Sequence, residues 1–194
     1  MDPHIKDTGF IPKKEWFAFF SHSGSEIVNL SNELGIIPKR IITNHTPGAE
    51  EIDPRLLDLK TELIYLGNRP SASDYERVLN RCDECMCTLH GWMRIVPKSV
   101  CNSYEMWNLH PGLITMYPEL KGADPQKRVA EEKKKEYEWI GCVIHRVEPG
   151  VDEGKIGMTG KYRNLYYSEK RITERLHELA LSMWVDFFAM CLSK

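Results

Sequence analysis

The chain has 194 residues, of which 42% are hydrophobic and 28% charged, so it can bury a core and is not disordered. Its formal net charge of −2 gives no electrostatic reason to expect nucleic acid or an anionic membrane as a partner. The N-terminal segment lacks a signal-peptide pattern, and the most apolar stretch, 179–192, is too short to span a bilayer. We therefore expect a single cytoplasmic domain over residues 1–194.

The N-terminal part of the chain predicts a strand–helix–strand unit. The apolar run 16–20 lacks polar alternation, which is typical of a strand covered on both faces. A small polar turn over 21–25 precedes a helical pattern over 27–34, which stops at Gly35. A second apolar run covers 40–43. This order predicts a βαβ unit with a right-handed crossover.

The rest of the chain continues the alternation of strands and helices. Further strands are expected at 62–66, 86–89, 105–109, 139–147 and 155–160. Helices are expected over 74–82, from Asp124-Pro125 onward, and from Ser168 nearly to the end, where an apolar helix packs on the core. The pattern predicts an α/β, Rossmann-like fold with a mostly parallel twisted sheet flanked by helices.

The cysteines do not predict a metal site. Cys82, Cys85 and Cys87 form a C-x-x-C-x-C cluster, but no second pair follows at zinc-finger spacing. The simpler interpretation places Cys85 and Cys87 on one face of a buried strand. We therefore expect no bound metal and a reducing compartment.

The segment Asn108-Leu109-His110-Pro111, followed by Asp152, is the strongest candidate for chemistry. Asn108 and His110 alternate on an extended segment, so their side chains face the same way, and Pro111 restricts the backbone just beyond them. An amide can stabilise an oxyanion, and an imidazole supported by a carboxylate can move a proton. Acyl transfer needs both functions.

Two loops that leave strand ends are candidates for ligand binding. In the first, the small residues Ser23, Gly24 and Ser25 would let backbone N–H groups approach an anion at a helix N-terminus, or would simply form a turn. The adjacent Glu26 argues against a phosphate there, because a carboxylate repels it.

The second loop, 91–97, contains Trp92, Met93, Arg94, Ile95 and Val96. Its aromatic, flexible and apolar side chains could line the pocket of a flat heterocycle. The alternative is an ordinary turn into a helix with Trp92 and Ile95 in the core, and without further evidence that alternative is favoured.

Together these segments resemble the folate-dependent formyltransferases, and most of all the glycinamide ribonucleotide formyltransferases. The resemblance is carried by motifs in the family's order, covering nearly the whole chain. These are a loop at 21–25, Gly-Trp-Met-Arg-Ile-Val at 91–96, Asn-Leu-His-Pro at 108–111, a Gly-Cys-Val-Ile-His-Arg-Val strand at 141–147 and Asp-Glu-Gly-Lys-Ile at 152–156. The resemblance implies a phosphate-binding N-terminal half and a C-terminal half with the folate-binding and catalytic loops.

The resemblance also implies the reaction and its small-molecule partners. The donor would be 10-formyltetrahydrofolate, and the acceptor a primary amine of a small phosphorylated molecule, most like glycinamide ribonucleotide. Asn108 would stabilise the oxyanion, His110 would exchange protons, and Asp152 would hold His110 and raise its pKa. The residues implied for the folate pocket are Trp92, Met93, Arg94, Ile95, Val96, Glu148 and Val151. Those implied for the acceptor are Ser23, Gly24, Ser25, Glu26 and Pro111.

Several departures from the family pattern concern the acceptor. Gly112 replaces the usual Ser, His22 replaces a Gly, Glu26 replaces an Asn, and Ala180 falls near the position of a ribose-binding Glu. They suggest the same reaction with an altered acceptor. The alternatives are an amino group on a sugar nucleotide or modified nucleotide, hydrolysis of 10-formyltetrahydrofolate, and a non-catalytic folate-binding protein.

Overall fold

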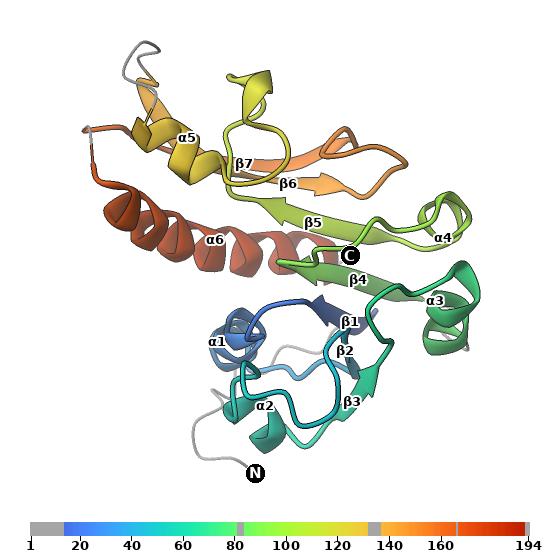
Figure 1. Ribbon diagram of the computed structural model, residues 1–194. Coiled ribbons are helices and arrows are strands. Elements are labelled where there is room, and N and C mark those ends of the chain that lie inside the picture. Colours follow the sequence, from blue (N-terminus) through green and yellow to red (C-terminus); the bar gives the residue numbers. More distant parts are fainter. Residues whose placement is uncertain (1–13, 81–83, 132–136, 166, 193–194) are drawn as a thin grey trace.

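The computed structural model describes residues 14–80, 84–131, 137–165 and 167–192. Within these residues, seven strands form one sheet in the order β3-β2-β1-β4-β5-β6-β7 (Figure 1). The strands are β1 (Glu15–Phe20), β2 (Arg40–Thr43), β3 (Glu62–Tyr65), β4 (Cys85–His90), β5 (Met106–His110), β6 (Trp139–Arg146) and β7 (Ile156–Arg163). The helices are α1 (Ser25–Leu34), α2 (Arg55–Asp58), α3 (Ala72–Leu79), α4 (Lys98–Ser103), α5 (Pro125–Glu131), α6 (Glu169–Leu192) and the 3-10 turn η1 (Pro118–Leu120).

Strands β3, β2, β1, β4 and β5 are parallel, whereas β6 and β7 add to the sheet as an antiparallel hairpin. The predicted α/β fold with a mostly parallel sheet is confirmed. The two C-terminal strands are antiparallel because a hairpin can join neighbouring strands through a short loop, whereas a parallel pair needs a crossover.

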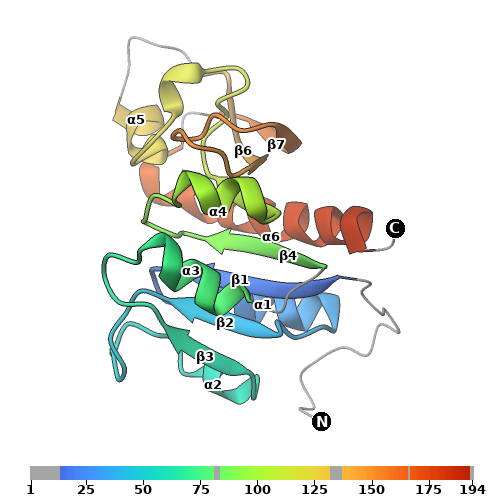
Figure 2. The same ribbon diagram turned by 90° about the vertical axis from the view of Figure 1, so that its right-hand side faces the viewer.

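Helices cover both faces of the sheet, with α1 and α6 on one face and α3 and α4 on the other (Figures 1 and 2). The packing of β1 explains why apolar and polar residues do not alternate in its sequence. Trp16, Ala18 and Phe20 pack in the core cluster shared with α1 and α6, while Phe17 and Phe19 pack in the cluster shared with α3 and α4. Both sets of side chains are buried, as expected for a central strand.

Helix α6 packs along the first of these faces, as the sequence predicts. Its buried residues recur at helical spacing and include Ile172, Leu176, Trp184 and Phe188. Among the residues that the structure describes, no helix is long and apolar enough to cross a membrane.

The predicted helix over 74–82 begins and ends earlier, as α3. Ser71 is its N-cap and forms a capping box with Asp74, so the helix starts two residues before the first predicted position. Cys85 and Cys87 lie on β4 and share one core cluster, which confirms their predicted common face, whereas Cys82 lies outside the described residues. Over the described ranges, no group of three or more His, Cys, Asp or Glu residues is placed to hold a metal.

The topology changes direction between β1 and β4. These strands are neighbours, but α1 after β1 and α4 after β4 lie on opposite faces of the sheet, so the two loops diverge at the carboxyl edge. This divergence is the topological switch point at which open α/β sheets bind ligands. The loops still touch, because the Met93 backbone N–H donates to Ser21 Oγ at 2.8 Å.

Candidate active site

Strands β5 and β6 bring together the polar side chains of the site. In the antiparallel pairing of these strands, Asn108 lies directly opposite His145, and His110 lies opposite Val143. Side chains that are directly opposite share a face, which here is the face away from α6, since Trp107 and Leu109 pack toward the α6 core. Asn108, His110 and His145 therefore project to the same side, as the predicted alternation requires.

Asp152 reaches the same place from the loop between β6 and β7. Its backbone is left-handed, with a φ of 53°. Two residues later, a Cβ atom on Gly154 would lie only 1.8 Å from the Arg146 carbonyl oxygen, so only glycine fits. The loop closes because the Arg146 N–H donates to the Lys155 carbonyl at 2.8 Å. The Asp-x-Gly motif thus has a structural explanation: the glycine lets the chain fold back and present the carboxylate.

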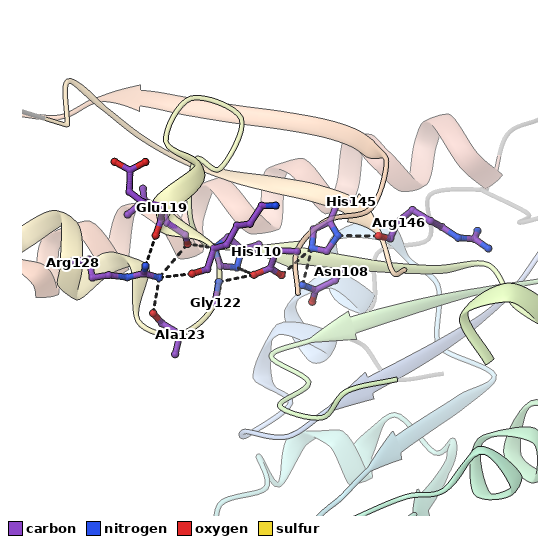
Figure 3. A network of polar contacts seen from close by, with 11 residues as sticks. Asn108, His110, Glu119, Gly122, Ala123, Arg128, His145 and Arg146 are labelled. Atoms are coloured by element: carbon purple, nitrogen blue, oxygen red, sulfur yellow. Dashed lines mark hydrogen bonds and ion pairs between the residues drawn. The ribbon is translucent and has the colours of Figure 1, made fainter. Parts of the chain in front are cut away.

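The Asp152 carboxylate is the centre of a polar network whose members Asn108, His110, Gly122 and His145 are labelled in Figure 3. One oxygen lies 3.2 Å from Nδ1 of His110 and accepts the Gly122 N–H at 2.9 Å. The other oxygen lies 3.3 Å from Nε2 of His145, which in turn lies 3.2 Å from Nδ2 of Asn108. The network joins the three residues predicted as catalytic.

Sequence reasoning missed one member of this network, His145. Nδ1 of His145 donates to the Arg146 carbonyl oxygen at 2.9 Å, which fixes the imidazole between Asp152 and Asn108. The strand also shifts register at Ile144 and His145, and such an irregularity can re-aim a side chain. The signal in the sequence is the place of His145 in the 141–147 motif that carries the family resemblance, from which no role was predicted for this residue.

The protonation of His110 differs from the prediction. Burial lowers the pKa of His110 below its ordinary value of 6.5, and the Asp152 carboxylate and Leu120 carbonyl only partly oppose this effect. The expected rise of the His110 pKa through Asp152 is therefore wrong, because desolvation outweighs the attraction. For Asp152, burial alone would raise the pKa, but hydrogen bonding with His145, the charge of His110 and the Gly122 N–H hold it below its ordinary value.

A loop between β5 and α5 encloses His110. Its Nε2 donates to the Leu120 carbonyl at 2.8 Å, so the ring nitrogens face a carbonyl oxygen on one side and a carboxylate on the other. A Cβ on Gly112 would lie 2.6 Å from Nε2, so glycine at this position permits the observed ring orientation. Replacement of the family's Ser by Gly112 is therefore coupled to the placement of the imidazole.

Arg128 of α5 holds this loop in shape and was also missed from the sequence. Its guanidinium donates to the backbone carbonyls of four residues, of which Glu119 and Ala123 are labelled in Figure 3. These carbonyls belong to Glu119, Leu120, Lys121 and Ala123. The predicted start of this helix at Pro125 is confirmed.

The residues predicted to border the folate pocket divide into exposed and buried side chains. Met93 and Ile95 are 56% and 76% exposed, and Val151 is also exposed. Trp92 and Val96 are buried, and Trp92 packs against Phe19 and Tyr75 and donates to the Tyr75 hydroxyl at 2.9 Å. The turn interpretation was therefore correct for Trp92 and wrong for Ile95.

The two charged residues of the predicted folate pocket already have protein partners. The Arg94 guanidinium donates to the Asn68 backbone carbonyl at 2.7 Å and also contacts the Asn68 side-chain oxygen. Glu148 is exposed and accepts the Lys155 N–H at 3.3 Å.

The predicted acceptor loop lies at the start of α1. Gly24 has a φ of 74°, a conformation that favours glycine, and a Cβ there would clash with Leu56. The Ser25 N–H donates to Ser23 Oγ at 3.3 Å, and Glu26 is only partly exposed. Pro111 is half-buried on the next loop. Ala180, by contrast, is buried in the core, so this position contributes no polar group to a ligand site.

An α/β sheet with an acid–base network at the carboxyl ends of its strands is typical of ligand-binding proteins and enzymes. Comparison with known proteins identifies the family. The family model for formyl transferases matches residues 37–187. The chain belongs to the formyl transferase family.

Individual proteins agree with this assignment. The chain is 32% identical over 93 residues to the trifunctional purine biosynthetic protein adenosine-3 of Drosophila melanogaster, a match that covers 46% of the chain and 6% of that much longer protein. The phosphoribosylglycinamide formyltransferase of Bacillus halodurans superposes with a TM-score of 0.76 at 22% identity, covering 93% of this chain and 96% of the other. A formyltetrahydrofolate deformylase of Pseudomonas putida gives 0.72 at 15% identity, covering 92% and 66%. At such identities the two structures show a shared fold.

Proposed function

We propose that this protein transfers the formyl group of 10-formyltetrahydrofolate to a primary amine of a small molecule. The observation that carries the proposal is the buried Asp152 carboxylate, which links His110, His145 and the amide of Asn108 at the end of β5. Family membership supports formyl transfer, and the names of the relatives support a folate donor.

Asn108 would stabilise charge on the formyl oxygen. Its Nδ2 carries two hydrogens, of which no more than one can point toward Nε2 of His145, the nitrogen that also lies beside Asp152. The second hydrogen is left for an oxyanion. A fixed donor of this kind stabilises a transition state without reorganising, and its removal typically costs about 3 kcal/mol.

His110 would receive and return the proton of the attacking amine. At neutral pH its lowered pKa favours the neutral imidazole, in which Nε2 carries the hydrogen donated to Leu120 and the basic Nδ1 faces Asp152. The proton of the amine would therefore reach Nδ1 by way of the Asp152 carboxylate. Once protonated, the ring would be stabilised by Asp152 on one side and by the Leu120 carbonyl on the other. The imidazole would therefore alternate between its two protonation states during the reaction.

The exposed apolar side chains next to the switch point suit the flat ring system of a folate. Met93 and Ile95 offer apolar surface there, Val151 offers it on the β6–β7 loop, and the buried Trp92 and Val96 support the 91–97 loop from within the core. Bound there, 10-formyltetrahydrofolate would supply the electrophilic formyl carbon.

The first acceptor to examine is glycinamide ribonucleotide, because relatives include a phosphoribosylglycinamide formyltransferase and a trifunctional purine biosynthetic protein. With this acceptor the pathway would be purine biosynthesis. If the acceptor were an amino-sugar nucleotide or a modified nucleotide, the same reaction would belong to another pathway.

The test is tetrahydrofolate release from 10-formyltetrahydrofolate, measured with and without each candidate amine. We expect release that depends on an amine. Release in buffer alone at the same rate would instead identify a deformylase, the activity named for the Pseudomonas putida structure. Folate binding without any release would identify a non-catalytic binding protein. An Asp152→Asn variant serves as the control for contaminating activity.

A further inference from the structure

A second imidazole–carboxylate pair lies at the switch point between β1 and β4. Nδ1 of His90, the last residue of β4, lies 2.6 Å from Oε2 of Glu26 in the first turn of α1. The two residues are 64 positions apart in the sequence, so only the fold brings them together. His90 is buried against Trp184, with ring centroids 5.2 Å apart, whereas the Glu26 side chain is 31% exposed. The Glu26 carboxylate is therefore the exposed end of an otherwise buried pair.

The hydrogen bonds that lead to this pair show which atoms donate and which accept. Trp16 Nε1 can only donate, and it donates to Thr88 Oγ1 at 2.7 Å. Among the contacts of the described residues, the Thr88 hydroxyl hydrogen has Nε2 of His90, also 2.7 Å away, as its acceptor. His90 therefore carries its hydrogen on Nδ1 and donates it to Glu26. In this assignment His90 donates and the Glu26 carboxylate accepts, so a carboxylate charge lies at the exposed end of the pair.

This charge sits where a helix would otherwise attract an anion. The N-terminus of α1 carries a partial positive charge, and Glu26 in its first turn already complements that charge. The Ser25 N–H, a first-turn donor that has no partner within the helix, donates to Ser23 Oγ. Asp53 donates its N–H to the Ser23 carbonyl at 2.9 Å, and its carboxylate is paired with the Arg55 guanidinium. The nearby cation is therefore already neutralised.

Glu26 itself retains capacity for a ligand. Its Oε2 accepts from His90, and within the described part of the chain Oε1 makes no hydrogen bond. A carboxylate oxygen accepts hydrogen bonds from hydroxyl or N–H groups and repels phosphate. The buried neighbours Thr88 and Trp16 fix the imidazole, so Glu26 is held in place rather than free to turn away from an anion.

We propose that Glu26, positioned by His90, selects an acceptor that presents a hydroxyl group instead of a phosphate to the start of α1. The inference rests on the proposed formyl transfer and specifies its acceptor. Glu26 would contact the acceptor, whereas His90 would act only as a positioning residue through Glu26. The acceptor would thus be an unphosphorylated amine at this end, such as an amino sugar or an aminated nucleoside.

The decisive comparison uses glycinamide ribonucleotide and its dephosphorylated nucleoside as acceptors for tetrahydrofolate release. We expect the wild-type protein to favour the nucleoside by about tenfold or more in kcat/KM. A Glu26→Gln variant, which can still accept from His90, should shift this ratio toward the nucleotide by at least about tenfold. A Glu33→Gln variant removes the same charge from the exposed far end of α1 and should leave the ratio unchanged.

An equilibrium measurement separates failure of this inference from failure of the proposed reaction. Inorganic phosphate is titrated into ¹⁵N-labelled wild-type, Glu26→Gln and Glu33→Gln proteins while the amide signals of residues 23–26 are followed. Tighter phosphate binding in Glu26→Gln than in the other two supports the inference even if neither acceptor is formylated. Binding that is no tighter in Glu26→Gln, or a wild-type preference for the nucleotide, overturns it. Glu26→Asn replaces the Gln variant if that protein does not fold.

Discussion

The two imidazole–carboxylate pairs at the carboxyl edge of the sheet are built in opposite ways. In the pair on the α5 side, Asp152 and His110 are both almost fully enclosed, and the carboxylate also contacts His145 and the Gly122 N–H. In the pair on the α1 side, His90 is buried but Glu26 is 31% exposed. The first pair has its charge satisfied within the protein, and the second presents its charge outward.

This difference separates two uses of the same residue types. A carboxylate whose lone pairs are occupied by protein donors can hold an imidazole and tune its protonation, but it has little capacity left for a ligand. A carboxylate with one oxygen free recognises a ligand and repels anions. We therefore assign proton transfer to the Asp152 network and acceptor selection to Glu26, and four perturbations test the first assignment.

The largest effect is expected from Asp152→Asn. The substitution keeps the shape but removes the charge that stabilises protonated His110, so kcat/KM for formyl transfer should fall by about a hundredfold to ten-thousandfold. Folate binding, followed by fluorescence titration, should change little. Glu153→Gln is the matched control, since the neighbouring Glu153 side chain is 62% exposed. Equal losses in both variants would remove Asp152 from the mechanism.

Asn108→Ala should have the next largest effect. Loss of one oxyanion donor lowers kcat by about two to three decades, while folate affinity stays close to that of wild type. Single-turnover kinetics with saturating folate measure this difference. Asn102→Ala, at an exposed position of α4, is the control. A change confined to KM would show that Asn108 binds substrate without stabilising the transition state.

Gly112→Ala tests whether the imidazole needs its observed orientation. The added Cβ would lie 2.6 Å from Nε2 and 2.9 Å from Cδ2 of His110, so the ring must move and break its bond to the Leu120 carbonyl. We expect a loss of about 1–3 kcal/mol in unfolding free energy, measured by urea denaturation, together with lower kcat. Unchanged stability and kcat would mean that the ring readily adopts another position.

The sequence predicts those parts of the site that depend on residues close together in the chain, and not those that depend on contacts between distant segments. The strand pattern and the spacing of Asn108, His110 and Asp152 identified the elements and the residues that the network joins. His145 was missed because its role arises from the antiparallel register that sets it opposite Asn108, and the 141–147 motif that contains it does not reveal this register.

The pairing of Glu26 with His90 was also beyond sequence reasoning. The repulsion of phosphate by Glu26 was predicted from its charge, but the partner that positions it comes from a different strand. The direction of the His110 pKa shift was predicted wrongly for a related reason. Spacing indicates that a carboxylate is near, but only the packed structure shows that burial outweighs its attraction.

The smallest expected effect is the pH dependence of stability. The folded-state pKa of His110 lies below its ordinary value of 6.5, so the unfolded chain binds this proton more tightly, and stability should fall as pH drops below about 6.5 toward the folded-state value. The pKa of Asp152 is also lowered, so its contribution is complete above 3.8 and is lost as pH falls further. The two groups act in the same direction but in successive windows. Urea denaturation of wild type and His110→Gln should therefore show a shallower pH dependence for the variant as the pH falls below about 6.5. A slope that is unchanged there would mean that His110 is not held neutral by burial, and the contrast between an enclosed catalytic pair and an exposed selecting pair would lose its electrostatic basis.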